Sequence, residues 1–83
     1  MTHALKIWPE WFKQVQDGTK TFELRKDDRP FSPGDNLLLQ EYEPKIKTYT
    51  GQEWEGQVTV VYREIPGLKS GYVLLGIKKT ERF

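Results

Sequence analysis

Lys20, Glu23 and Arg25 are the residues of this chain whose types and spacing best suit chemistry, and they closely follow Gly18. A carboxylate beside two cationic groups combines a hydrogen-bond acceptor with charged donors. Such a set can read the hydrogen-bonding edge of a nucleobase while a cation holds a phosphate. We therefore predict that these three side chains share one cleft and bind a nucleotide, a nucleoside or RNA.

Side-chain alternation along a strand predicts which way these residues point. Phe22 and Leu24 fall on one face of a strand, and Thr21, Glu23 and Arg25 fall on the other. We expect the apolar pair to pack into a core and the polar residues to face a groove.

Each charged residue also has a plain structural explanation. Lys20 follows the end of a predicted helix, where a cation stabilises the helix terminus by roughly 0.3 to 1 kcal/mol. Glu23 and Arg25 share a strand face, so they could form an exposed ion pair that contributes about 0 to 1 kcal/mol. Both the structural and the ligand-binding interpretation stay open at this point.

Further basic and aromatic residues are candidates for contacts with the same ligand. Lys6 lies on the opposite strand face from its apolar neighbours and can point toward the cleft of Lys20. Lys26 and Arg29 extend the basic group, although solvated surface charges are the alternative. Tyr42 can stack on an unpaired base, which contributes about 1 to 3 kcal/mol per base, or it can belong to the core.

Three other aromatic or ionisable residues have a functional and a structural interpretation. Tyr49 and Trp54 are candidates for base stacking or for the core. His3 could shuttle protons, because the unperturbed pKa of histidine lies near neutrality. A strand histidine that makes one structural hydrogen bond is the more common case.

Composition restricts the class of protein and the kind of site. The 83 residues suit a single domain, residues 1–83. With no cysteine and one histidine, we expect no disulfide framework, no metal site and no cofactor. The net charge of +1 predicts that any nucleic-acid site is a local pocket, because a global basic excess is lacking. No apolar run approaches the roughly 18 residues of a membrane span and no leader is recognisable, so we expect a cytoplasmic monomer.

Six segments are expected to form regular structure. The helix is predicted over residues 9–17, because Pro9 suits the first helical position and Gly18 suits a left-handed cap. Strands are predicted from alternation, or from apolar runs bounded by turn residues. The predicted strands are residues 3–7, 20–26, 36–43, 53–64 and 72–78.

Aromatic and glycine positions refine this assignment. Trp8 and Trp11 lie near the spacing of one buried helical face, so we expect them to pack the helix on the sheet. Residues 49–52 are expected to form a turn or the tip of a hairpin. Gly56 and Gly76 lie inside strands, where glycine marks a bend or a close backbone approach.

These elements predict an α+β fold, a small five- to six-stranded mixed β-barrel with one N-terminal helix. Closure into a barrel removes the exposed edges that so short a sheet could not otherwise cover.

The order of the motifs resembles the ASCH domains of the PUA-like superfamily, in particular a short, uncharacterised subgroup from bacteria and phages. The resemblance implies a β-barrel with a cleft beside the early helix, and a role in binding RNA or modified nucleosides. The segments that carry the resemblance are HALKI (3–7), PEWF (9–12), KTFELRK (20–26), PGD (33–35), YTG (49–51) and GYVLLGI (71–77).

The same resemblance implies an enzymatic alternative. One branch of the superfamily removes an acyl group from a modified cytidine with a Lys, a Thr and a distant Glu. Lys20 matches that Lys, but Glu23 stands where the branch has its Thr, and Thr21 is only a neighbouring hydroxyl. We therefore favour a binding module, with an amidohydrolase using Lys20, Thr21 and Glu23, or a protein-interaction adaptor, as the alternatives.

Overall fold

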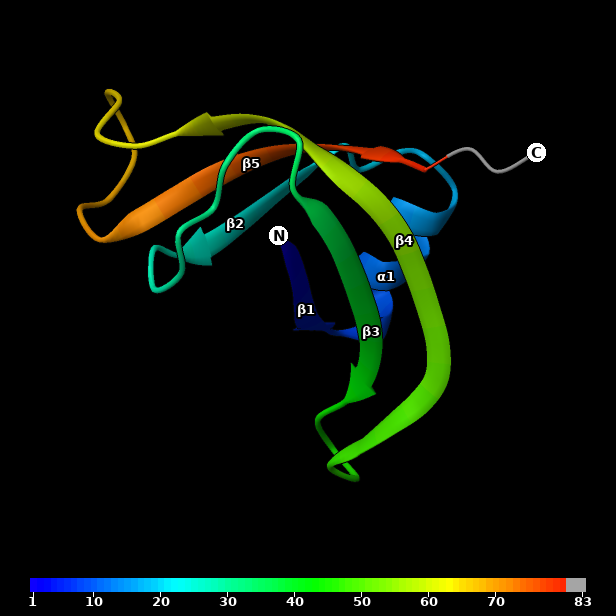
Figure 1. Ribbon diagram of the computed structural model, residues 1–83. Coiled ribbons are helices and arrows are strands. Elements are labelled where there is room, and N and C mark those ends of the chain that lie inside the picture. The colour runs from blue at the N-terminus through cyan, green and yellow to red at the C-terminus, as the bar shows by residue number, and fades with distance from the viewer. Residues whose placement is uncertain (81–83) are drawn as a thin grey trace.

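The computed structural model describes residues 1–80, so the last three residues of the predicted domain, 81–83, lie outside the described part. Within residues 1–80 the chain forms one helix and five strands (Figure 1). In chain order they are β1 (Thr2–Ile7), α1 (Pro9–Gln16), β2 (Phe22–Lys26), β3 (Asn36–Glu43), β4 (Thr48–Tyr62) and β5 (Tyr72–Lys79). The predicted elements are confirmed to within two residues at each end, except for the start of β4.

All five strands belong to one mixed sheet in the order β1-β3-β4-β5-β2. β1 and β3 run parallel, and the other neighbours are antiparallel. The long, curved β4 pairs with β3 along its first part and with β5 along its last part, which curls the sheet into a half-barrel (Figure 1). The predicted α+β class and mixed sheet are confirmed. The predicted closure is not reached, because β1 and β2 are the two edges of the sheet.

The apolar core fills the concave side of the half-barrel, where α1 packs against β3 and β4. Phe12 and Val15 are the buried residues of α1, and they lie three positions apart on one helical face. The buried apolar residues are Leu5, Ile7, Phe12, Val15, Phe31, Leu37, Leu39, Trp54, Val58, Val73, Leu75 and Ile77.

Trp8 and Trp11 do not pack the helix on the sheet, contrary to the prediction. Their exposed fractions are 45% and 44%, and their rings stack on each other with centroids 5.2 Å apart. Trp8 precedes the first helical residue, Pro9, so helical periodicity does not extend to it. Trp11 is the direct neighbour of the buried Phe12 and points about 100° away from it around the helix axis.

β2 is also oriented opposite to the prediction. Glu23 pairs with Leu75 and Arg25 pairs with Val73, and paired residues share one face of a sheet. Leu75 and Val73 are fully buried, so Glu23 and Arg25 face the concave interior. Phe22 and Leu24 are instead 47% and 55% exposed. The pairing with β5 decides the orientation, because a shift by one residue would turn every side chain of β2 to the other face.

The predicted turn at residues 49–52 is wrong, because these residues belong to β4. The turn lies at residues 44–47, and Tyr49 pairs directly with Tyr42 of β3. Pro44 cannot donate to a strand ladder, whereas two tyrosines in cross-strand positions stabilise the pairing.

Register irregularities and a glycine shape the second half of β4. The register with β5 shifts between Val58 and Val60, so Val61 rather than Val60 packs against the core. A Cβ atom added at Gly76 would lie 2.6 Å from Thr59 Oγ1 and 2.8 Å from Val60 Cγ2. The predicted close approach at Gly76 is therefore confirmed.

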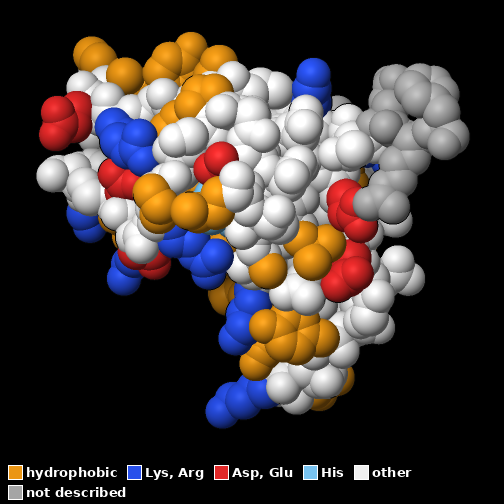
Figure 2. Space-filling view, in the orientation of Figure 1, with side chains coloured by type: hydrophobic (Ala, Val, Ile, Leu, Met, Phe, Trp, Pro, Cys, Tyr) orange, Lys and Arg blue, Asp and Glu red, His pale blue; other side chains and the backbone are white. Residues whose placement is uncertain are grey.

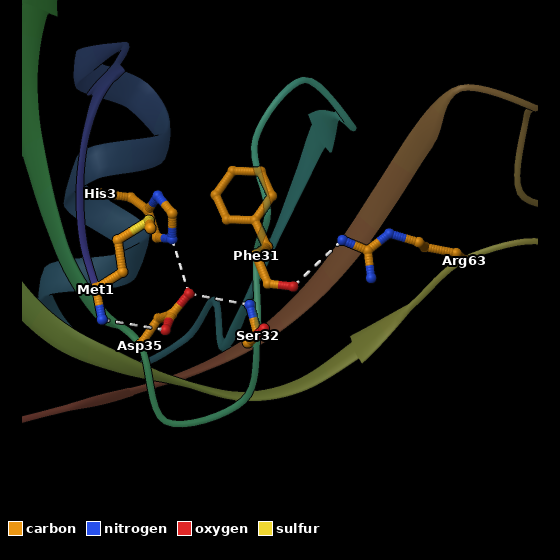
Figure 3. A network of polar contacts seen from close by, with 6 residues as sticks. All are labelled: Met1, His3, Phe31, Ser32, Asp35 and Arg63. Atoms are coloured by element: carbon orange, nitrogen blue, oxygen red, sulfur yellow. Dashed lines mark hydrogen bonds and ion pairs between the residues drawn. The ribbon is translucent and has the colours of Figure 1, made fainter.

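A polar network ties β1 to the loop before β3 (Figure 3). His3 Nε2 lies 2.8 Å from Asp35 Oδ2, and the Ser32 amide donates to the same oxygen at 3.0 Å. The hydrogen bond with His3 is the main reason why the pKa of Asp35 lies below its ordinary value of 3.8. Arg63 anchors the same loop by donating to the Phe31 carbonyl at 3.2 Å. The structural interpretation of His3 is thus confirmed.

Candidate functional site

The gap between the two edge strands, β1 and β2, carries the candidate site, and we call this gap the seam. Two pockets open along it. The first, which we call the aromatic pocket, has a volume of about 630 Å³ and lies between the end of β1, α1 and β2. It is lined by Lys6, Ile7, Trp8, Trp11, Gln14, Thr19, Lys20, Phe22, Glu23, Leu24 and Arg25.

Lys20, Glu23 and Arg25 converge in the wall of the aromatic pocket. The Glu23 side chain is only 6% exposed. Its Oε1 accepts a hydrogen bond from Lys20 Nζ at 2.5 Å, and its Oε2 accepts one from Arg25 Nε at 2.9 Å. The carboxylate thus holds two cations side by side, and the three groups together carry one net positive charge.

The Lys20 side chain is held by the start of β2, while its backbone amide donates to the Gln14 carbonyl of the helix at 3.0 Å. Its Nζ donates to the Phe22 carbonyl at 2.6 Å and lies 4.8 Å from the centroid of the Phe22 ring. These contacts, together with the bond to Glu23, direct the ammonium group into the pocket wall. The alternative that Lys20 serves mainly to neutralise the helix terminus is therefore not needed to explain its position.

Arg25 spans the seam. Its Nη2 donates a hydrogen bond to the backbone carbonyl of Lys6, on the opposite edge strand. The Lys6 side chain itself is exposed, and its Nζ lies 4.4 Å above the ring of Tyr42 and 5.8 Å from that of Tyr49. Cation–π attraction of this kind orients Lys6 without neutralising its charge.

Four exposed apolar side chains surround the polar cluster: Trp8, Trp11, Phe22 and Leu24. Each is between 44% and 55% exposed, and all four line the aromatic pocket. Gathered apolar side chains on a surface mark a binding site more often than single ones do. The sequence interpretation missed this role, although the position of Trp8 before Pro9 is a signal that it lies outside the buried helical face.

The second pocket, which we call the basic pocket, adjoins the first and has a volume of about 410 Å³. Figure 2 shows Lys and Arg side chains gathered on this side of the molecule, between the end of β2 and the β3–β4 hairpin, where the surface is hollowed. Tyr42 lines neither pocket but packs against Tyr49, with ring centroids 5.1 Å apart. The basic pocket is lined by Ala4, Leu5, Lys6, Arg25, Lys26, Asp28, Arg29, Phe31, Gln40 and Tyr49.

Two of the candidate residues lie away from the seam. Thr21 is exposed and lines neither pocket, and its carbonyl accepts a hydrogen bond from the Ile77 amide. Trp54 is 7% exposed and belongs to the core, so the structural interpretation of this residue is confirmed.

Within residues 1–80, no three His, Asp or Glu side chains lie close enough together to hold a metal ion. Of the described part of the chain, no helix has both the length and the apolar character to cross a membrane.

Comparisons with known proteins give a family and a phage relative. A family model described as "Domain of unknown function (DUF3850)" matches residues 2–77. A curated relative, the "Uncharacterized 12.9 kDa protein in GpA 3'region" of Escherichia phage P2, is 34% identical over 73 residues. The aligned region covers 88% of this chain but 64% of the relative, so the chain spans less than two thirds of that protein.

Proposed function

The chain belongs to the DUF3850 family, and we propose that this domain binds a nucleotide in the aromatic pocket, either free or as an unpaired unit of an RNA strand. One observation carries the proposal. A group of exposed apolar side chains lies directly beside a hydrogen-bonded cluster of Lys20, Glu23 and Arg25. A nucleobase has the same two properties, because its faces are apolar and its edge is polar.

The apolar side chains suit the face of a base. Trp8, Trp11 and Phe22 offer ring surfaces that remain open to solvent. Stacking of a base on such a ring contributes about 1 to 3 kcal/mol. The pocket volume of about 630 Å³ falls within the range of roughly 300 to 1,000 Å³ that is typical of small-ligand sites.

The charged side chains suit the edge of the base and its phosphate. Glu23 accepts from Lys20 and Arg25 with both oxygens, so its role is to position two donors. Lys6 has no carboxylate partner within residues 1–80, and it lines the same pocket. We assign Lys6 to the phosphate, because an unpaired ammonium group gains most from an anion.

We also propose that the fold is ASCH-like, within the PUA-like superfamily. The support is the early helix and the pocket beside it, two features that the sequence resemblance implies, although the sheet forms a half-barrel rather than a closed barrel.

The amidohydrolase alternative has less support. Thr21 lies outside the pocket, and both oxygens of Glu23 are engaged by cations. Activation of a nucleophile requires a base within hydrogen-bond reach of a hydroxyl or of water. The adaptor alternative rests on the exposed apolar residues alone and leaves the cluster at Glu23 without a role.

The proposal is tested by titrating the protein with adenosine and uridine 5'-monophosphates while recording tryptophan fluorescence. Trp8 and Trp11 are exposed in the pocket whereas Trp54 is buried, so base stacking should quench the first two. We expect saturable quenching in the wild type. We expect Lys20→Ala to raise the dissociation constant at least fivefold. Thr21→Ala is the matched control and should bind like the wild type. Absence of saturable binding up to millimolar ligand would overturn the proposal.

A further inference from the structure

The basic pocket is lined by two cations, Lys26 and Arg29, that form no ion pair within the described residues 1–80. Arg25 has a carboxylate partner, Glu23. Lys26 and Arg29, by contrast, form no side-chain hydrogen bond or ion pair with any residue of the described range 1–80. Asp28 is the one carboxylate among the residues that line the pocket. Cations therefore outnumber carboxylates in the lining of this pocket, although the chain as a whole is close to neutral.

Lys6 and Arg25 line both pockets, so the two pockets are neighbours along the seam. Arg25 crosses the seam through its hydrogen bond to the Lys6 carbonyl. A chain molecule that leaves the aromatic pocket in this direction passes these two residues before it reaches Lys26 and Arg29. The lining changes from mainly aromatic in the first pocket to mainly cationic in the second.

Tyr49 gives the basic pocket a stacking surface of its own. It is 50% exposed and lines the pocket, while Tyr42 packs against it. An exposed, supported ring beside cations is the combination by which proteins bind single-stranded nucleic acid.

We propose that the basic pocket is a second subsite, which binds the phosphate and the base of the neighbouring nucleotide, and that the ligand is a single-stranded nucleic acid of at least two nucleotides. This inference rests on the proposed function of the aromatic pocket. In the proposed assignment, Lys26 and Arg29 contact the phosphate between the two nucleotides or the next one, and Tyr49 stacks on the second base. The strand must be unpaired, because base faces are accessible only outside a duplex.

The test compares ligand lengths and two double variants. Adenosine 5'-monophosphate and oligoadenylates of two and four nucleotides are titrated against the wild type, Lys26→Ala/Arg29→Ala and Lys78→Ala/Lys79→Ala. The last variant is the matched control, because Lys78 and Lys79 are exposed in β5 and line neither pocket. Circular dichroism verifies that each variant is folded.

We expect the dinucleotide to bind at least tenfold more tightly than the mononucleotide. Lys26→Ala/Arg29→Ala should remove most of this advantage while changing the affinity for the mononucleotide less than twofold. It should also reduce the salt slope for the tetranucleotide by about 1.4, since each phosphate contact on a single strand contributes about 0.7. The control variant should retain the preference for longer strands.

The outcomes separate this inference from the proposed function. If the mononucleotide binds but the dinucleotide gains nothing, the second subsite is wrong and the aromatic pocket stands. If the control variant loses as much affinity as Lys26→Ala/Arg29→Ala, an extended basic surface replaces the subsite. If no nucleotide of any length binds, the proposed function itself fails, and the second subsite fails with it.

Discussion

The guanidinium group of Arg25 donates a hydrogen bond to the backbone carbonyl of Lys6 and so bridges the two edge strands of the half-barrel. The same side chain donates to Glu23, which faces the concave interior. Arg25 therefore links β1 and β2 through its side chain, at the place where these two strands do not pair with each other. Because Arg25 also lines both pockets, we expect it to contribute both to the stability of the fold and to ligand binding.

Substitution of Arg25 should affect both folding and binding. Arg25→Ala leaves one oxygen of the buried Glu23 carboxylate without its partner, which costs roughly 1 to 3 kcal/mol for such a group, and it removes the exposed hydrogen bond to the Lys6 carbonyl. We expect a loss of that size in the free energy of unfolding, measured by urea denaturation. Arg25→Lys restores a charge but not the planar set of donors, so it should recover only part of the loss. A loss below about 0.5 kcal/mol in Arg25→Ala would show that the bridge across the seam contributes little.

The stability of the protein should fall in acid because of Asp35. Its pKa lies below the ordinary value of 3.8, mainly because of the hydrogen bond with His3. A carboxylate with a lowered folded pKa stabilises the fold above its unfolded pKa, and this contribution disappears as pH falls through the folded pKa. We expect the free energy of unfolding to decrease below about pH 4 in the wild type.

Asp35→Asn separates this effect from the other carboxylates. The variant cannot titrate at position 35, so its unfolding free energy should be lower near neutral pH and should change less with pH in this range. Denaturation curves at several pH values for both proteins check the expectation. Equal pH dependence of the two proteins would assign the acid sensitivity to other carboxylates.

Local sequence patterns were sufficient to predict most of the helix and strand positions, because the formation of these elements depends largely on residues that are neighbours in the sequence. Pro9 and Gly18 bound the helix, and the alternation in residues 3–7 predicts β1. The orientation of β2 was not predictable in this way. Charged and apolar residues alternate along β2, so either set could face the core. Which set does so depends on the pairing with β5, which lies about fifty residues away in the sequence.

The candidate site was predictable in part for a related reason. Lys20, Glu23 and Arg25 are close in sequence, so their convergence could be expected. The role of Trp8 and Trp11 in the pocket wall was missed, because their spacing resembles that of core residues and only the packing of α1 reveals their exposure. The seam itself depends on which strands become sheet edges, and that is a property of the whole topology.

The three tryptophans should respond differently to substitution. Trp54→Ala removes a buried ring and should destabilise the protein by about 3 to 5 kcal/mol. Trp11→Ala removes a half-exposed ring, so we expect a loss of about 1 kcal/mol or less together with weaker nucleotide binding. Urea denaturation and nucleotide titration of both variants provide the comparison. A large loss of stability in Trp11→Ala with unchanged nucleotide binding would show that Trp11 has a structural role and does not contact the ligand.

Two glycines in the sheet should resist substitution to different degrees. A Cβ atom added at Gly56 would overlap the Lys78 carbonyl oxygen and the ring of Trp54. At Gly76 its two closest contacts would be side-chain atoms, of Thr59 and Val60, and the nearest backbone atom, Val60 N, would lie 3.6 Å away. Side chains can move more readily than backbone, so Gly56→Ala should destabilise the protein more than Gly76→Ala. For Gly76→Ala we expect a loss of about 1 to 3 kcal/mol in the free energy of unfolding. Thermal unfolding of the two variants ranks them, and the reverse order would contradict the packing described at Gly56.

Hydrolysis of an acylated nucleoside would distinguish a hydrolase from a binding module. We expect no hydrolysis of acylated cytidine far above the uncatalysed rate, even if the nucleoside binds in the aromatic pocket. Glu23 occupies the position where the hydrolase branch has its hydroxyl, and Thr21 lies outside the pocket. Acyl transfer by that route needs a nucleophilic oxygen next to a base, and a carboxylate held by Lys20 and Arg25 supplies no such oxygen.

Glu23→Gln makes this comparison decisive. Glutamine keeps the shape of the side chain and one accepting oxygen, but it cannot take up a proton at neutral pH. Product release is followed by chromatography for the wild type and the variant under identical conditions. If the wild type releases free cytidine rapidly and Glu23→Gln does not, Glu23 activates water as a general base and the domain is a hydrolase. If both proteins stay at the uncatalysed rate while the wild type binds the nucleoside, Glu23 serves to position Lys20 and Arg25.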